Sequence, residues 1–225
     1  HGGEIFAIAG VAGNGQIEVA DAIAGLLPLH KGKVWLNGKD ITEESIRRRA
    51  LEGISYIPED RQKTGLVMDF NIADNMIIKD YYNEPFAKKH ILDYKTIKKH
   101  ARAMIKKYHV KTPSENVKVR NLSGGNQQKV VIARVLDPEP VLDLVAHPTR
   151  GLDLGAVDNV LNILMKERNR GAGILFISGE LQEIMALSDR IIVLYSGECM
   201  GELDGETADQ NVIGQMMLGQ VPEVQ

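Results

Sequence analysis

The sequence predicts an α/β fold with a mostly parallel sheet, and two observations carry that prediction. Short apolar runs alternate with amphipathic stretches of helical period. A glycine-rich turn at 10–16 follows the first apolar run and opens a helical stretch, which is the strand–loop–helix setting of a phosphate-binding loop, or P-loop. The expected strands are Ile5–Ala9, Lys33–Leu36, Ser55–Ile57, Val141–Ala146, Ile174–Ser178 and Arg190–Tyr195.

Helices and turns fill the gaps between these strands. Lys31-Gly32 and Asn37-Gly38 are expected to be turns. Gly171 marks the end of the clearest helix. The apolar residues of that helix, spaced i, i+3, i+4, i+7 and i+8, are Val157, Val160, Leu161, Leu164 and Met165.

The middle of the chain differs from both ends, because it is helical and poor in strands. We therefore expect two parts: a nucleotide-binding α/β core at 1–68 and 137–225, and a helical subdomain at 69–136. The apolar stripe of its longest helix is Tyr94, Ile97, Ala101, Met104, Ile105 and Tyr108. Between 88 and 111 there are nine lysines and arginines and a single acid, Asp93. A solvated helix face is the simplest interpretation; a surface for anionic lipid or an acidic partner is the alternative.

Composition sets the broad class. The hydrophobic fraction is 44%, the charged fraction 25% and the net charge −3, values typical of a globular protein and not of a nucleic-acid binder. The single cysteine, Cys199, rules out an internal disulfide and favours a reducing, cytosolic setting. No apolar run approaches the ~20 residues that cross a bilayer. Because a strand begins almost at once after His1, the sequence is expected to be a fragment of a longer polypeptide.

The glycine-rich turn has the spacing of the phosphate loop G-x-x-x-x-G-K-[ST], with Gln16 at the lysine position and Ile17 at the hydroxyl position. Backbone N–H groups and a helix N-terminus still suit a phosphate. Gln16 has no charge, and Ile17 cannot ligate Mg²⁺. A plain strand–helix turn is the alternative. The candidate nucleotide-binding residues are Gly10, Gly13, Asn14, Gly15, Gln16 and Ile17.

A second motif precedes the helical run from Gln127 to Leu136. A serine hydroxyl, backbone N–H groups and the positive end of a helix would converge there, which suits the binding of a terminal phosphate. A plain serine N-cap is the alternative. The motif residues are Leu122, Ser123, Gly124, Gly125 and Asn126.

The third motif is Pro-Thr-Arg-Gly-Leu-Asp at 148–153. Together, in this order, the three motifs resemble the ATP-binding cassette (ABC) family over essentially the whole chain. Tyr-Ile-Pro-Glu-Asp-Arg at 56–61 and Leu-Ser-Gly-Gly-Asn-Gln-Gln-Lys at 122–129 resemble one member in particular. That member is the C-terminal cassette of the two-cassette ATPase subunits of simple-sugar importers, and the nucleoside-uptake branch is the nearest.

The resemblance assigns roles to five further positions. Ala146 stands where the family has a Mg²⁺-binding Asp, and His147 where it has the Glu that polarises water. Glu59 replaces a glutamine, and Gly179 replaces the switch histidine. Asp153, which faces the dimer partner in the family, is retained. We therefore expect no confident catalytic residue and no metal ligand in the chain's own site.

Two departures test this alignment. His147 is expected to be a non-catalytic replacement, although an imidazole is also able to act as a base. Asp143 places a charge in a strand that should be buried, which would also follow from an alignment shifted by one residue.

The resemblance implies ATP as ligand, with Mg²⁺ in a partner's site. The implied partners are a second, N-terminal cassette, transmembrane permease subunits and, indirectly, an external solute-binding protein, at the cytoplasmic face of the cell membrane; no nucleic acid is expected. The chain would be part of an importer ATPase with a degenerate ATP site, inactive or very weak alone, whose signature completes the partner's site. The alternatives are a regulatory or scaffolding cassette and a non-transport ABC protein. The helical segment 69–111 is expected to dock the permease through an apolar face that includes Ile72, Met76 and Ile77; packing of this face inside the subdomain is the alternative.

Overall fold

The computed structural model describes residues 1–220, which fall into two compact units. Unit 1 comprises His1–Tyr56, Pro140–Pro148 and the chain from Leu161 onward; unit 2 comprises Ile57–Glu139 and Thr149–Val160. Each unit is described by itself below.

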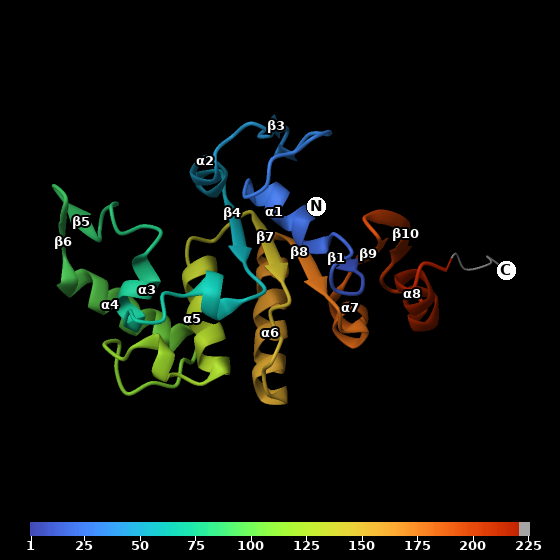
Figure 1. The fold of residues 1–225 in the computed structure, drawn as a ribbon. Coiled ribbons are helices and arrows are strands. Elements are labelled where there is room, and N and C mark those ends of the chain that lie inside the picture. The colour runs from blue at the N-terminus through green and yellow to red at the C-terminus, as the bar shows by residue number, and fades with distance from the viewer. Residues whose placement is uncertain (221–225) are drawn as a thin grey trace. The chain divides into compact units, whose positions relative to one another are not determined.

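A six-stranded sheet forms the centre of unit 1, in the order β10-β9-β1-β8-β7-β4 (Figure 1). Strand β1 pairs in parallel with both β8 and β9, β8 pairs in parallel with β7, and β10 is antiparallel to β9 at the edge. This confirms the mostly parallel sheet that the sequence predicts. The strands are β1 (Ile5–Ala9), β4 (Ile54–Ile57), β7 (Leu142–Ala146), β8 (Gly173–Ser178), β9 (Arg190–Tyr195) and β10 (Glu198–Asp204).

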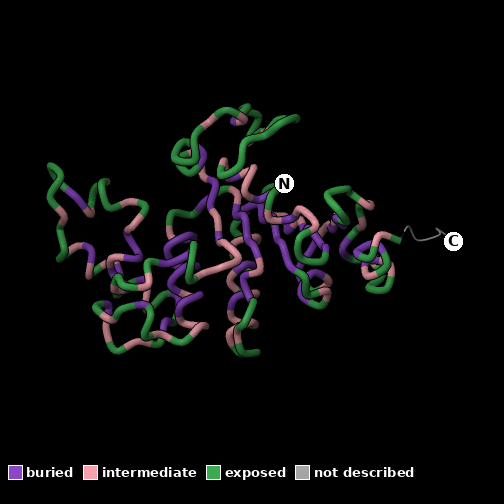
Figure 2. Tube along the Cα trace, viewed as in Figure 1, coloured by how far each residue is buried: buried purple, intermediate pink, exposed green. Residues whose placement is uncertain are grey.

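Helices cover this sheet. Helix α1 (Gln16–Ala24) packs on β7 and β8, α7 (Leu181–Leu187) on β1 and β8, and α8 (Gln210–Met217) on β9 and β10. Alternate strand residues meet α1, since successive side chains in a strand point to opposite faces. The core on the α1 side contains Ile8, Ala20, Ala24, Leu144, Leu175, Ile177 and Leu194. Figure 2 shows the continuous burial of the central strands.

A buried arginine fixes the end of α1. Arg49, on α2 (Ile46–Leu51), is 4% exposed. Its guanidinium donates to the carbonyls of Ala22 and Ile23, both at 2.7 Å, and so caps orphan carbonyls in the last turn of α1. This contact joins two elements that are some 25 residues apart in sequence.

Several strands differ from the prediction. The predicted strand 33–36 is only β2 (Trp35–Leu36), paired with β3 (Lys39–Asp40) across the predicted Asn37-Gly38 turn, where both residues have positive φ. Strand β10 was not predicted, because Glu198–Asp204 lacks an alternation of apolar and polar residues. The strand forms by pairing with β9.

Unit 2 is mainly helical, but it also holds a small hairpin of β5 (Ala87–Lys88) and β6 (Ile91–Leu92) that the sequence did not predict. Its helices are α3 (Ile72–Ile77), α4 (Tyr94–Lys107) and α5 (Gly124–Leu136), with a π-helical turn at Arg61–Gly65 and a 3-10 turn at Val119–Asn121. Helix α6 (Leu154–Arg170) spans the division between the units and ends, as predicted, before Gly171.

Two surface predictions for unit 2 need correction. Ile72, Met76 and Ile77 are at most 4% exposed, because α3 packs on α4 and α5, so their apolar face is internal. Tyr94, expected in the buried stripe of α4, is 54% exposed. It is the first residue of the helix, where no neighbouring turn covers it.

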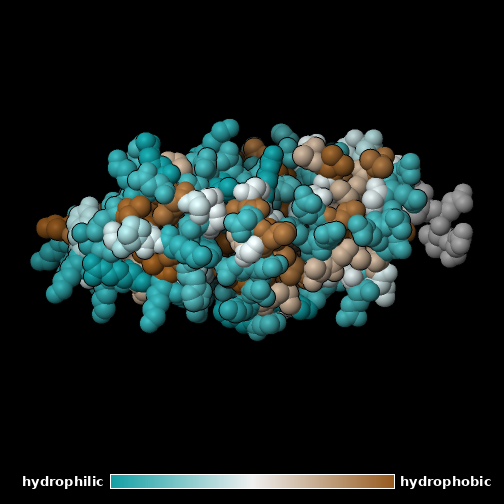
Figure 3. Space-filling model, turned by 90° about the horizontal axis from the view of Figure 1, so that it is seen from below, coloured by the Kyte–Doolittle hydropathy of each residue, from teal (hydrophilic) through white to brown (hydrophobic). Residues whose placement is uncertain are grey.

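The face seen in Figure 3 is largely hydrophilic, with hydrophobic residues in small groups. Within residues 1–220, no helix combines the length and the apolar character that crossing a bilayer requires.

Asp143 occupies the buried strand that the sequence assigned to it. The residue is fully buried in β7, and the Ser55 hydroxyl of the neighbouring β4 donates to its Oδ1. The other carboxyl oxygen, Oδ2, has no hydrogen-bond partner. Burial raises the pKa of Asp143 to about 6, since a desolvated carboxylate is disfavoured. The Asp143 carboxyl therefore lies inside the sheet, in the strand that the sequence predicts to be buried.

This carboxyl should make stability depend on pH. Its pKa of about 6 in the folded chain lies above the ordinary aspartate value of 3.8, so the stability that the protonated carboxyl contributes is fully present below about pH 4 and is lost as the pH rises through 6. We expect Asp143→Asn to raise the free energy of unfolding by up to about 3 kcal/mol at pH 7.5, with the gain shrinking towards pH 4.5. Urea unfolding at both values measures this. The exposed control Glu206→Gln should change little, and an Asp143→Asn gain independent of pH would contradict the assignment.

Candidate functional site

The carboxyl ends of three parallel strands bring one group of predicted residues together in unit 1. Ala9 of β1 is in register with Ser178 of β8, and Ala146 of β7 with Ile177. The glycine-rich loop, Gly179 and His147 each follow one of these strands directly. They therefore share one edge of the sheet, which is where open α/β sheets bind ligands.

The glycine-rich loop has the backbone of an anion-binding turn. Gly13 and Gly15 have φ values of 89° and 102°, conformations that other residues rarely adopt. Gly15 is the N-cap of α1, with no side-chain hydrogen bond to the helix end. Val11, Ala12 and Gly13 are exposed. Backbone N–H groups around alternating left-handed residues, together with a helix N-terminus, form a concave site for a phosphate.

Asn14 ties this loop to the turn between β9 and β10. Its side-chain oxygen accepts from the Ser196 amide at 2.7 Å, and its carbonyl accepts from the Gly197 amide at 3.2 Å. Its side-chain nitrogen donates to the Val11 carbonyl at 3.0 Å. The shape of the loop is thus held by contacts that need no bound nucleotide.

Gln16 folds back into the loop. The side chain is 4% exposed, and its Nε2 donates to the Val11 carbonyl at 3.0 Å. It lies against Gly10, where an added Cβ would also come within 2.8 Å of the Leu194 carbonyl. The residue at the lysine position therefore closes the loop on itself and brings no positive charge to it.

The ends of β7 and β8 carry Ala146, His147 and Gly179. Ala146 is fully buried. His147 is half-buried with φ 44°, and its amide donates to the Ile177 carbonyl at 2.8 Å. At Gly179 the neighbouring Ser178 hydroxyl donates to Glu183 at 2.9 Å and accepts from the Glu180 amide at 3.0 Å, so this turn is held by its own hydrogen bonds.

The residues at this edge do not fit Mg²⁺. The positions that would ligate the ion carry the alkyl side chains of Ile17 and Ala146, whereas Mg²⁺ requires oxygen ligands. Nowhere in the described part of the chain do three or more His, Cys, Asp or Glu side chains come close enough to hold a metal ion. The loop backbone, in contrast, suits a phosphate group.

The second group of predicted residues lies in unit 2. Ser123 is exposed and is the N-cap of α5, but its side chain makes no capping bond to the helix. Its hydroxyl oxygen instead accepts from Asn126 Nδ2 at 2.9 Å, and Asn126 Oδ1 accepts from the Lys111 amide at 2.7 Å. The Ser123 side chain thus leaves the first amides of α5 without a capping bond, and amides at a helix start suit an incoming anion.

Glu59 and Asp153 flank this helix start within the same unit. Arg150 forms an ion pair with Glu59, and Arg61 donates to the Arg150 carbonyl at 2.8 Å. Asp153 Oδ1 accepts from the Ala156 amide at 3.0 Å and so caps the start of α6. The two arginines were not among the predicted site residues, because their contacts join positions about 90 residues apart and leave no periodic signal in the sequence.

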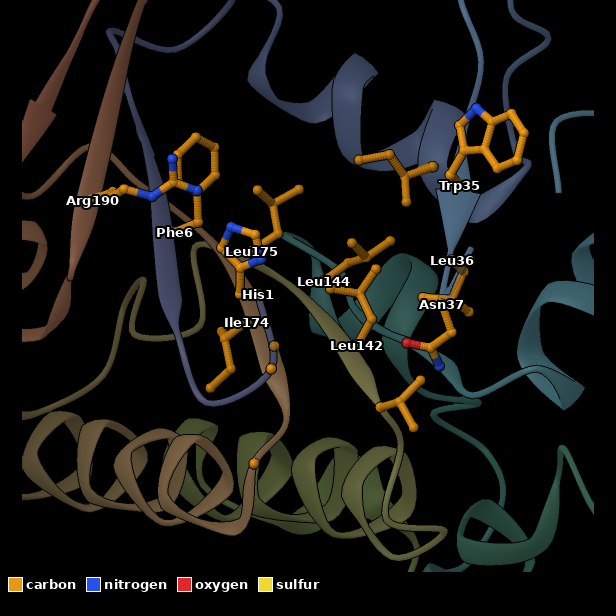
Figure 4. Close-up of a pocket in the computed structure, with 15 residues that line it drawn as sticks. His1, Phe6, Trp35, Leu36, Asn37, Leu142, Leu144, Ile174, Leu175 and Arg190 are labelled. Atoms are coloured by element: carbon orange, nitrogen blue, oxygen red, sulfur yellow. The ribbon is translucent and has the colours of Figure 1, made fainter. Parts of the chain in front are cut away.

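A separate pocket of about 590 Å³ lies in unit 1 (Figure 4). It is lined by Phe6, Trp35, Leu142, Leu144 and Leu175, among others, with Arg190 and Asn37 at its margin. Leu142 and Gly173 are the first residues of β7 and β8, so the pocket reaches the amino ends of strands whose carboxyl ends carry the loop. It is therefore distinct from the predicted nucleotide edge.

Comparisons with known proteins point to one protein family. The family model described as ABC transporter matches residues 1–150. The nucleoside import ATP-binding protein NupA of Lactococcus lactis is 41% identical over 217 residues, covering 96% of this chain and 43% of that protein. The guanosine import ATP-binding protein NupO of Bacillus subtilis is 43% identical, and the match covers 96% of this chain and 42% of that protein. A solved nucleotide-free ATP-binding cassette from an ABC transporter superposes with a TM-score of 0.82 at 21% identity, over 98% of this chain and 88% of that one.

The chain belongs to the ABC transporter family. The resemblance to the ABC family is thereby confirmed, as is the predicted fold class. The chain spans less than half the length of the curated relatives that it matches.

The geometry of the loop predicts how nucleotide binds. Backbone donors at Gly10–Gln16 need no metal, while positions 17 and 146 offer none of its ligands, so binding of ATP should be weak and nearly independent of Mg²⁺. Titration calorimetry of the chain with ATP, with Mg²⁺ present and with EDTA, measures this. Strong tightening by Mg²⁺ would show that other residues ligate the ion.

Proposed function

We propose that this chain is the C-terminal cassette of a two-cassette importer ATPase for simple sugars or nucleosides, with a degenerate ATP site of its own. In this proposal its signature, Leu122–Asn126, completes the hydrolytic site on a second cassette. The observation that carries it is the contrast between two helix starts, one with Gln16 folded into its loop and one with Ser123 open to solvent.

Four positions of the chain's own ATP site support the proposal that this site is degenerate. Phosphoryl transfer depends on neutralising charge and placing the attacking water. Gln16, Ile17, Ala146 and His147 stand where the family has the lysine, the Mg²⁺ hydroxyl, the Mg²⁺ carboxylate and the water-positioning Glu. Such residues act as a unit, so their losses do not simply add. The isolated chain is therefore expected to hydrolyse ATP negligibly.

The geometry of α5 supports the proposal that the signature completes the site on a second cassette. The γ-phosphate of ATP held by the other cassette would accept hydrogen bonds from the Ser123 hydroxyl and from the amides of Gly124 and Gly125. Donors fixed in place stabilise charge that develops in the transition state. In that other site Mg²⁺ would neutralise phosphate charge. Asp153, at the start of α6, would face the same partner.

The remaining partners follow from this assignment. The cassette would work at the cytoplasmic face of the membrane with permease subunits, and indirectly with an external solute-binding protein. Because Ile72, Met76 and Ile77 are buried, docking by the segment 69–111 would rely on its exposed residues, such as Phe70, which is 46% exposed. The division into a core, 1–68 and 137–225, and a helical subdomain, 69–136, belongs to the same proposal.

A scaffolding cassette that never contributes to hydrolysis is the second candidate. The buried Gln16 and the absence of Mg²⁺ ligands at positions 17 and 146 suit it equally well. The open signature, with its exposed Ser123, favours the first candidate.

One pair of substitutions separates the two candidates. In the full-length, assembled importer, Ser123→Arg should abolish ATP hydrolysis and uptake, because a bulky cation blocks closure over the phosphate. Gln16→Lys should change both little, since Ile17, Ala146 and His147 still leave Mg²⁺ and water unplaced. Steady-state phosphate release and solute uptake measure the effect.

The reverse pattern would invert the assignment. If Ser123→Arg leaves both rates near wild type while Gln16→Lys raises them, the active site is the chain's own. If neither variant has an effect, the scaffolding candidate stands.

A further inference from the structure

We infer that Arg61 is a positioning residue that fixes the signature helix against the Thr149–Asp153 loop, so that Ser123 and Asp153 are presented as one rigid surface. The use of that surface rests on the proposed function, whereas the positioning itself does not. All of the residues involved lie in unit 2.

The guanidinium of Arg61 reaches both segments. Its Nη1 donates to the Arg150 carbonyl at 2.8 Å. Its Nη2 faces Gly124 so closely that a Cβ there would lie 2.9 Å away, and a Cβ at Gly151 would lie 3.8 Å away. A Cβ at position 124 would require the Arg61 guanidinium to move away from the start of α5. The glycine that follows Ser123 thus serves to admit Arg61 as well as to expose a backbone amide.

Neighbouring side chains add two further links. Gln62 Nε2 donates to Gln127 Oε1 at 2.9 Å, and the buried Gln127 donates in turn to the carbonyls of Val119 and Leu122, both at 3.2 Å. Arg150 closes the set through its ion pair with Glu59. The segment 59–62 is therefore bonded to α5 and to the loop before α6, and Gln127 of α5 is bonded in turn to the residues just before that helix.

The segment is itself held rigid. The Asp60 side chain accepts from the amides of Gln62 and Lys63, both at 3.0 Å, and these bonds hold the pKa of Asp60 below its ordinary value. Thr64 Oγ1 donates to the Asp60 carbonyl at 2.7 Å. Arg61 thus extends from a fixed turn, and its side chain sets the distance between the two segments that it touches.

The placement of Arg61 points to more than stability. A cation beside a helix N-terminus is electrostatically unfavourable, since the helix dipole is positive there. In addition, its buried Nε has no hydrogen-bond partner. A residue that served stability alone would gain from an uncharged side chain at this place. A forked cation at this place instead fixes two segments at once and adds positive potential beside Ser123.

The test uses Arg61→Gln and Arg61→Lys, with Lys63→Gln as the matched control that removes an adjacent, exposed cation. In this chain, hydrogen exchange of peptides 122–127 and 149–153 should accelerate together in Arg61→Gln, with the unfolding midpoint little changed. Arg61→Lys, which keeps the charge but loses the fork, should lie between. Lys63→Gln should match wild type. Unchanged exchange in Arg61→Gln, or acceleration in only one of the two segments, overturns the inference.

A second measurement in the full-length, assembled importer tests the consequence for turnover. Arg61→Gln should lower kcat for ATP about ten- to a hundredfold with KM little changed, because misplacement by about 1 Å has effects of that size. Ser123→Arg is the reference variant. If it abolishes turnover while Arg61→Gln leaves kcat unchanged, the inference fails and the proposed function stands. If Ser123→Arg has no effect, the proposed function fails, and the exchange result alone decides the positioning role.

Discussion

The parallel register of β1, β8 and β7 decides what the rest of unit 1 is able to do. Because these strands run the same way with Ala9 beside Ser178 and Ala146 beside Ile177, the glycine-rich loop, Gly179 and His147 emerge at one edge. Helix α1 begins in that loop, so its N-terminus points to the same place. Backbone pairing of the strands places these segments together. Replacing the side chains at this edge would therefore leave the architecture intact.

The same sheet contains a buried carboxyl group, that of Asp143. Asp143 lies where an apolar residue would be expected, and a single hydroxyl, that of Ser55 on the adjacent strand, meets one of its oxygens. The carboxyl stays compatible with burial because its pKa rises to about 6, so that near neutrality the site lies close to the boundary between the two protonation states. In unit 2 the comparable polar set, Glu59, Arg61, Gln62 and Arg150, lies around the start of α5 and not in a core.

Much of this was predictable, and the failures have physical causes. Strands such as Ile5–Ala9 and Ile174–Ser178 are apolar runs bounded by turns, and helix α6 carries a clear period, so local pattern was sufficient. Strand β10 and the β5–β6 hairpin form through pairing that composition does not encode. The burial of Ile72, Met76 and Ile77 depends on the packing of α3 against α4 and α5. The positions of the loop and signature residues followed from motif spacing, whereas the contacts of Arg61 depend on long-range geometry.

The central claim is that nucleotide is turned over at the other cassette while this chain supplies the signature. Trapping the assembled importer with orthovanadate and a photoreactive ATP analogue, then mapping the labelled peptides by mass spectrometry, locates the trapped nucleotide directly. The account predicts label on the phosphate loop of the second cassette, with any contact from this chain confined to the region of Ser123. Vanadate-dependent label on residues 10–17 of this chain would contradict it.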